Sequence, residues 1–266
     1  MLEQFPYLRM YQVVLIIVSI FLTARILFYQ HIPELEKPVP PKESFLKPLM
    51  NVIVIPEYIS FCSYCFLLTF FTAACPQIFS LIEKDMLSFT KTEIVFIGNL
   101  LIVGALAGFV IGGRMVDKLG TKYVFMFCHF GFGAIIILFL LRSLLPGKII
   151  VIVGILTLLF GLVQAASGIA MTSETLVLMP KENKSLAIGL WFTLFNAGAG
   201  LSGIMSSTAL ELNLINPEWS LFGLQMSSYD GLLLMFGTMV LLMTVTLGLI
   251  PSMIKKTPAA WIPQST

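Results

Sequence analysis

Long apolar runs separated by short polar breaks dominate this sequence. A helix needs about 20 mostly apolar residues to cross roughly 30 Å of hydrocarbon. By that criterion the pattern predicts an all-α membrane protein with about seven transmembrane helices. These are expected near Met10–Tyr29, Glu57–Ser80, Ile94–Gly112, Tyr123–Leu141, Ile149–Thr172, Leu186–Leu210 and Tyr229–Ile250.

The longest polar stretch lies between the first and second apolar runs. Residues 30–56 hold three closely spaced prolines, which block helix continuation, and three lysines, which indicate a cytoplasmic location. Within this stretch, Ser44–Val54 is a candidate for a helix at the membrane interface. The predicted organisation is a single transmembrane helix over 1–29, a cytoplasmic linker over 30–56 and a six-helix transmembrane bundle over 57–266.

Composition supports a chain embedded in a lipid bilayer. Hydrophobic residues make up 58% and charged residues only 11%, whereas soluble domains average about 25% charged residues. The net charge of +2 comes with no basic patch beyond the loops, so no nucleic-acid partner is expected. The four cysteines lie in apolar runs, which predicts buried thiols. The spacing of Cys62 and Cys65 could indicate a redox or metal pair, but inert packing is favoured because no lysine or histidine lies nearby to activate a thiol. Neither a metal nor a cofactor is expected.

One polar break is unusual in its composition. It lies between the runs Ile94–Gly112 and Tyr123–Leu141 and is predicted to be a tight loop between two helices. Gly113 is expected to let one helix end pack closely, and Gly120 to permit the backbone of a sharp reversal. Asp117 is expected just before the next helix, where the helix dipole favours a carboxylate. The basic residues that indicate a cytoplasmic loop are Arg114, Lys118 and Lys122.

This break resembles the signature loop of the major facilitator superfamily, Gly-x-Leu-Ala-Asp-Arg-x-Gly-Arg-Lys-x-x-Leu. The identical positions are Gly113, Asp117, Gly120 and Lys122, and the conservative replacements are Met115, Val116, Lys118 and Phe125. Thr121 departs from the pattern, since the family prefers a base there. The resemblance implies a transporter, not an enzyme, that moves a small solute by alternating access between two six-helix bundles.

The position of the break favours the C-terminal half of such a transporter, because it follows the second helix after the linker. The first segment would then resemble the last helix of an N-terminal half, and a partner half would be missing. The competing placement makes Glu57 onward an N-terminal half with an extra helix in front, but Gly161–Gln164 lacks the arginine usual there. Neither the drug-antiporter motif nor the sugar-porter motif is present, so the solute stays unknown.

Other functions remain open on the sequence alone. A chain of about seven helices could be a non-transporting membrane subunit or a truncated gene product. A membrane enzyme is disfavoured because the two histidines, His31 and His129, have no other reactive groups converging on them. No ionisable residue is expected at mid-membrane depth, so a coupling carboxylate either lies in the missing half or is not used.

The resemblance also implies roles for particular residues. The second and fifth segments would face the cavity, and the candidates for solute contact are Tyr64, Thr69, Thr72, Gln164, Ser167 and Asn196. For each of these, an interhelical hydrogen bond is the alternative role. The gating loop would comprise Gly113, Arg114, Asp117, Lys118, Gly120 and Lys122. Asp117 would pair with a base and face the start of the sixth segment near Leu186. A row of glycines expected at a close helix contact comprises Gly104, Gly108 and Gly112.

Basic residues predict the orientation in the cell membrane. One side carries Arg25, Lys37, Lys42, Lys47, Arg114, Lys118, Lys122, Lys181, Lys184, Lys255 and Lys256. The other side carries Arg9, Lys84, Lys91, Arg142 and Lys148. The first side is predicted to be cytoplasmic by the positive-inside rule. The C-terminus would then be cytoplasmic and, with an odd number of spans, the N-terminus outside.

Overall fold

A computed structural model describes residues 6–29, 46–180, 182–216, 218–221 and 223–249. The chain divides into two units, Met1–Ser44 and Phe45–Thr266. Most of the predicted linker, residues 30–45, and the basic pair after residue 249 lie outside the described residues. The first unit contributes one helix, α1 (Pro6–Tyr29), whose 24 residues are enough to cross a bilayer.

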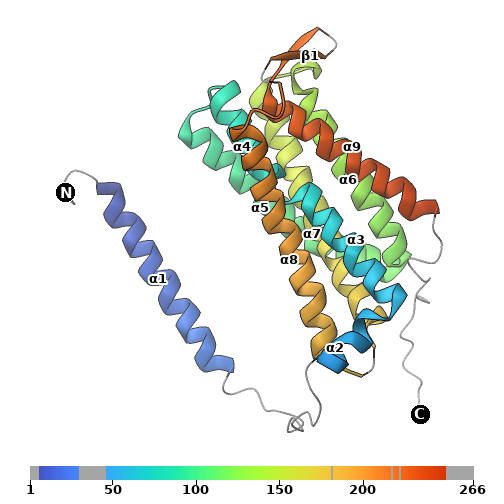
Figure 1. Cartoon of the computed structure of the whole chain (residues 1–266). Helices are drawn as coiled ribbons and strands as arrows, with labels where there is room; N and C mark the ends of the chain where they lie inside the picture. The colour runs from blue at the N-terminus through green and yellow to red at the C-terminus, as the bar shows by residue number, and fades with distance from the viewer. Residues whose placement is uncertain (1–5, 30–45, 181, 217, 222, 250–266) are drawn as a thin grey trace. The chain divides into compact units, whose positions relative to one another are not determined.

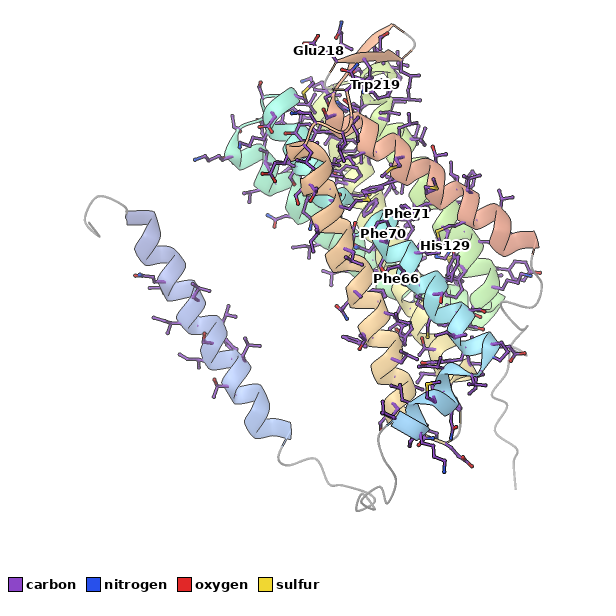
Figure 2. The ribbon with its side chains drawn as sticks, viewed as in Figure 1. Phe66, Phe70, Phe71, His129, Glu218 and Trp219 are labelled. Carbon is purple, nitrogen blue, oxygen red and sulfur yellow. The ribbon has the colours of Figure 1, made fainter. Side chains whose placement is uncertain are left out.

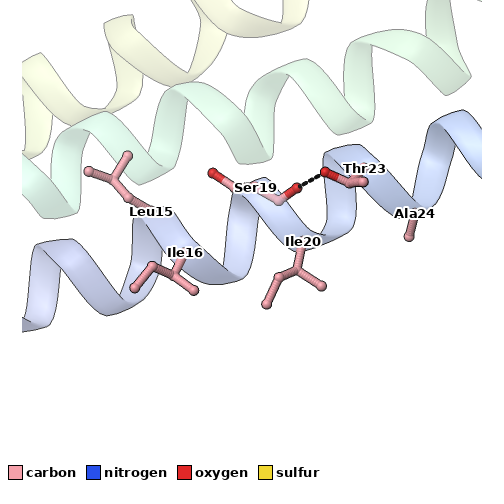
Figure 3. Close-up of a pocket in the computed structure, with 6 residues that line it drawn as sticks. All are labelled: Leu15, Ile16, Ser19, Ile20, Thr23 and Ala24. Atoms are coloured by element: carbon pink, nitrogen blue, oxygen red, sulfur yellow. Dashed lines mark hydrogen bonds between the residues drawn. The ribbon is translucent and has the colours of Figure 1, made fainter.

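The described side chains of α1 are almost all exposed and mostly apolar. Along one side they form a shallow groove, in which Thr23 Oγ1 donates a 2.9 Å hydrogen bond to the carbonyl oxygen of Ser19 (Figure 3). The residues lining this groove are Leu15, Ile16, Ser19, Ile20, Thr23 and Ala24. An all-round apolar surface of this kind suits contact with lipid or with other helices.

Among its described residues, the second unit has six spans that are long and apolar enough to cross a membrane. The first is built of α3 (Pro56–Thr72), α4 (Cys75–Leu81) and the π-helical turn η2 (Ile82–Met86). The others are α5 (Lys91–Leu119), α6 (Thr121–Leu140), α7 (Ile149–Leu178), α8 (Lys184–Glu211) and α9 (Ser228–Leu249). The predicted all-α membrane fold is therefore confirmed, with six spans in this unit and the apolar helix α1 in the other.

Three shorter elements complete the unit (Figure 1). Helix α2 (Leu46–Ile53) precedes α3, and a 3₁₀ turn, η3 (Arg142–Leu144), follows α6. An antiparallel hairpin of β1 (Trp219–Leu221) and β2 (Leu224–Met226) joins α8 to α9, with Trp219 opposite Met226. This hairpin stands at the end of the bundle opposite α2 (Figure 2, at the labelled Trp219).

The spans pack as pairs around α6 and α7. Helix α5 packs along α7, α6 contacts both α7 and α9, and α3 packs along α8. Aromatic side chains fill the interior, where the rings of Phe79 and Phe139 stack with centroids 3.9 Å apart and Phe160 meets Phe79 edge to face. By contrast, α5 and α8 are mostly exposed, each with only 17% of its apolar window buried. These two helices therefore present large faces with no partner among the described residues.

The contact between α5 and α7 is made by glycine. A Cβ atom added at Gly104 or Gly108 would overlap the carbonyl oxygens of Leu158 and Leu162 on α7. One added at Gly112 would lie 2.6 Å from the Cα of Ala166. Backbones this close require residues without a side chain, as in other small-residue helix contacts.

The span that α3 begins contains a proline, Pro76, and continues past it. The span breaks at Ala73 and Ala74, and Pro76 then lies in the first turn of α4, where its missing N–H would have no partner in any case. At the break, the backbone N–H of Ala74 donates to Ser202 Oγ on α8 at 3.2 Å. A side chain of a neighbouring helix thus replaces the lost intrahelical bond, and the span continues to Met86.

The break predicted as the gating loop is also mostly helical. Helix α5 runs on through Gly113 and Asp117 to Leu119, and α6 starts two residues later. Only Gly120 is outside a helix; its φ of +83° is one that glycine adopts easily, as expected for the reversal. The prediction of a loop was wrong because apolar periodicity cannot show how far a helix extends beyond the hydrocarbon. At the other end of α5, Thr90 and Glu93 form a capping box.

At the opposite end of the bundle from Gly120, a buried ion pair joins two connections. Arg142 Nη1 lies 2.6 Å from Asp230 Oδ1, with both side chains almost fully buried. Asp230 Oδ2 also accepts hydrogen bonds from the backbone N–H and the hydroxyl of Ser227. The pair therefore ties the end of α6 to the start of α9.

Candidate functional site

Four amide side chains in the spans are exposed on the surface of the second unit. Gln164 lies at the middle of α7 and Asn196 at the middle of α8, while Gln77 on α4 and Asn99 on α5 lie nearer the hairpin end. A side-chain amide in contact with hydrocarbon leaves hydrogen-bonding groups unsatisfied and is unfavourable. Faces that carry exposed amides are therefore poor lipid surfaces and suit water or a polar partner.

The exposed faces of α6 and α9 have a different character. The exposed side chains there are aromatic and aliphatic, with Thr238 as the one polar residue among those described. The large apolar ones are Tyr123, Phe127, Phe130, Leu138, Met239, Leu242 and Val245. The bundle thus has a side suited to lipid at α6 and α9, and polar positions on α4, α5, α7 and α8.

The six predicted solute contacts divide into two groups. Gln164 and Asn196 are exposed, and the Asn196 amide nitrogen donates to the Phe192 carbonyl oxygen at 2.7 Å. Thr69 and Thr72 are buried and donate to backbone carbonyls one turn earlier on α3. Thr69 also lies within hydrogen-bond distance of the Phe195 carbonyl oxygen on α8. In this conformation the two threonines serve helix packing and do not face an open cavity.

The other two candidates, Tyr64 and Ser167, both contact His129, which was not among the predicted solute contacts. The Tyr64 hydroxyl on α3 is hydrogen-bonded to His129 Nδ1 on α6. The other ring nitrogen of His129 lies 3.3 Å from Ser167 Oγ on α7. His129 and Ser167 are fully buried, and Figure 2 shows His129 inside the bundle. A polar bridge therefore joins three helices. The sequence could not show it, because its two bonded pairs are 65 and 38 residues apart.

Removing the Tyr64 hydroxyl tests this bridge. Tyr64→Phe should lower the free energy of unfolding by about 1 kcal/mol, because the buried His129 nitrogen loses its partner. Tyr123→Phe is the matched control, since that ring is 59% exposed on α6. Unfolding in detergent, followed by circular dichroism, measures both variants. Equal stability of the two would argue against the bridge.

A buried carboxyl group lies close to Gly120. Glu174 on α7 is fully buried, and its Oε2 accepts a 2.5 Å hydrogen bond from the Thr121 hydroxyl at the start of α6. Its other oxygen has no partner among the described residues. The contact ties the C-terminal end of α7 to the α5–α6 junction. The burial of Glu174 depends on the packing of α6 against α7, which the sequence alone does not show.

Asp117 has an unexpected position. It is exposed in the last turn of α5 and forms no hydrogen bond or ion pair with the described residues. The negative end of a helix dipole disfavours a carboxylate there. The expected contact with the start of α8 near Leu186 is not formed in this structure, where α5 and α8 do not pack together. The charge therefore has no described partner to offset its unfavourable position.

The described residues contain no cluster of three or more histidine, cysteine or acidic side chains arranged for a metal ion. The four cysteines are buried and free, as their apolar surroundings predicted.

Together, the six spans, the glycine-packed helix pair and the amide-bearing faces define a polytopic integral membrane protein. The sequence profile of the Major Facilitator Superfamily matches residues 5–203, about three quarters of the chain. The chain belongs to this family, whose members are membrane transporters. A comparison with curated proteins gave no match.

Proposed function

We propose that this chain forms one bundle of a transporter that moves a small solute by alternating access. The observation that carries the proposal is the position of Gln164 and Asn196, both exposed at the middle of membrane-spanning helices. Exposed amides at that depth need water, solute or a polar partner. A second six-helix bundle facing these positions would complete a pathway whose solute site lies near the midplane, as is usual in such transporters.

Within this proposal, Gln164 and Asn196 contact solute, and Gln77 and Asn99 line the approach from the hairpin end. The buried Tyr64, Thr69, Thr72 and Ser167 act as packing residues in the conformation described. The alternative, a membrane subunit or truncated product that does not transport, predicts that Gln164 and Asn196 are covered permanently by another protein or remain without a function.

Water access distinguishes these possibilities. Cysteines placed at Gln164 and Asn196 should react with a small, water-soluble thiol reagent, because the pathway admits water. Cysteines at Phe130 and Leu138, on the apolar exposed face of α6, should react far more slowly. The native cysteines are buried, so the unmodified chain gives the background. Slow reaction at all four positions would contradict a water-filled pathway at Gln164 and Asn196.

The orientation of the bundle is proposed from its charges. At the end where α3 begins, the described basic residues are Lys47, Arg114, Lys118, Lys122 and Lys184. At the hairpin end they are Lys84, Lys91, Arg142 and Lys148, and Arg142 is neutralised by Asp230. The more basic end would lie in the cytoplasm. In this orientation the C-terminus is cytoplasmic and the N-terminus of α1 is outside.

The gating segment is proposed to act when the bundles meet. Asp117 lies at an unfavourable helix end without a described partner, which suits a carboxylate whose partner comes from elsewhere in the transporter. The rest of the proposed segment, with Gly120 at its reversal, comprises Gly113, Arg114, Lys118 and Lys122. Closure on the cytoplasmic side would bring a base or a helix N-terminus to Asp117.

Asp117→Asn should therefore have opposite effects on stability and transport. The single bundle should keep its stability or gain about 0.3–1 kcal/mol, because a charge is removed from the negative end of α5. Uptake by the complete transporter should fall, because closure loses a charge-assisted contact. Detergent unfolding and uptake into vesicles measure the two effects. A stability loss with normal uptake would show that Asp117 supports the fold and does not gate.

A further inference from the structure

Helix α2 has three distinct faces. Val52 is 1% exposed and belongs to the buried core, and α2 contacts both α3 and α8. Leu46, Met50 and Val54, the residue directly after the helix, follow one another at four-residue intervals, and their exposed fractions are 67%, 55% and 72%. The polar residues Lys47 and Asn51 are also exposed, and each directly follows one of the apolar residues, Leu46 and Met50. At 100° per residue, the polar face therefore adjoins the exposed apolar face and lies away from Val52.

This arrangement suits a helix at the surface of a bilayer better than a helix surrounded by water. A helix at the interface needs one apolar face toward the acyl chains and one polar face toward the headgroups. Here the remaining face is already occupied by the bundle. Only Val54 and Ile55 separate α2 from Pro56, the first residue of a spanning helix, so α2 is held near the membrane boundary (Figure 1).

Charge at this end of the bundle also fits lipid headgroups. The basic residues on the described surface there are Lys47, Arg114, Lys118, Lys122 and Lys184, and the acidic ones are Glu57, Asp117 and Glu182. This surface is thus net positive, which favours a leaflet that contains anionic lipids. A second protein would satisfy the apolar stripe too, but it would not explain the adjoining polar face or the position at the boundary.

We propose that α2 is a lipid-binding element that inserts Leu46, Met50 and Val54 at the boundary between headgroups and acyl chains of the leaflet surrounding this end of the bundle. It holds the starts of α3 and α8 at a fixed depth, because α2 contacts both helices. The composition of that leaflet then affects how easily these two helices move. This role does not depend on the solute or on the proposed transport function.

Fluorescent probes on two neighbouring residues test the proposal. The full chain, with Met50→Cys or Asn51→Cys carrying an environment-sensitive fluorophore, is reconstituted in vesicles of phosphatidylcholine and phosphatidylglycerol. Some lipids carry a spin label near the top of the acyl chain. We expect blue-shifted emission at position 50 that the spin-labelled lipid quenches and aqueous iodide does not. Position 51 should show the reverse, and unmodified chain corrects for labelling of native cysteines.

Two results would overturn the proposal. Equal quenching of positions 50 and 51 by the spin-labelled lipid would show that α2 does not insert with a defined face. Protection of position 50 from iodide without quenching by lipid would show that another protein covers the stripe. Neither measurement involves uptake, so both are independent of the transport proposal.

Discussion

Replacing Asp230 by asparagine is expected to lower the free energy of unfolding by about 3–5 kcal/mol. The reason is that Arg142, only 7% exposed, would remain as a buried charge without a counter-charge. Its Nη1 would keep the Phe139 carbonyl oxygen as an acceptor, but its Nε already has no partner. Chemical unfolding in detergent, compared with the unmodified chain, measures the loss.

A surface ion pair near the same end provides the control. Lys84 Nζ lies 3.8 Å from Asp85 Oδ1, and the Lys84 side chain is 70% exposed. Lys84→Ala should change the stability by less than about 1 kcal/mol, because exposed pairs are weak. If Asp230→Asn proved as mild as Lys84→Ala, then the Arg142 pair would not be the buried tie between α6 and α9 described above.

The second large effect is expected from adding a single methyl group to α5. Gly108→Ala would place a Cβ against the Leu162 carbonyl oxygen, where the backbones of α5 and α7 touch. Separating the two helices should cost about 1–3 kcal/mol and reduce the yield of folded protein. Thermal unfolding in detergent and expression level measure these changes.

Gly98→Ala is the matched control on the same helix. No atom lies within 4 Å of a Cβ added at Gly98, so this change should be neutral or should stabilise the helix by up to about 1 kcal/mol. The proposed contact therefore predicts a loss of stability for Gly108→Ala and no loss for Gly98→Ala. Losses of equal size would indicate a general sensitivity of α5 to alanine instead of a close contact at Gly108.

Several features of this protein follow from local sequence. Apolar length predicts the spans, because each must cover the hydrocarbon with internally bonded backbone. The Thr90 and Glu93 capping box forms from residues three positions apart, and Gly120 has the positive φ that its place between two helices requires. The spacing of Gly104, Gly108 and Gly112 puts them on one face of α5, so a close helix contact could be predicted there.

Other features were decided by tertiary packing. The sequence could not distinguish Tyr64 and Ser167, buried against His129, from Gln164 and Asn196, which are exposed, because all four are polar residues in apolar helices. A proline such as Pro76 usually interrupts a helix. Here Ser202 of α8 accepts a hydrogen bond from the backbone N–H of Ala74 at the break, and the span continues. Asp230 forms an ion pair with Arg142, which lies 88 positions away in the sequence. Burial and partnership depend on which helix faces lie together, and periodicity within one helix contains no information about its neighbour.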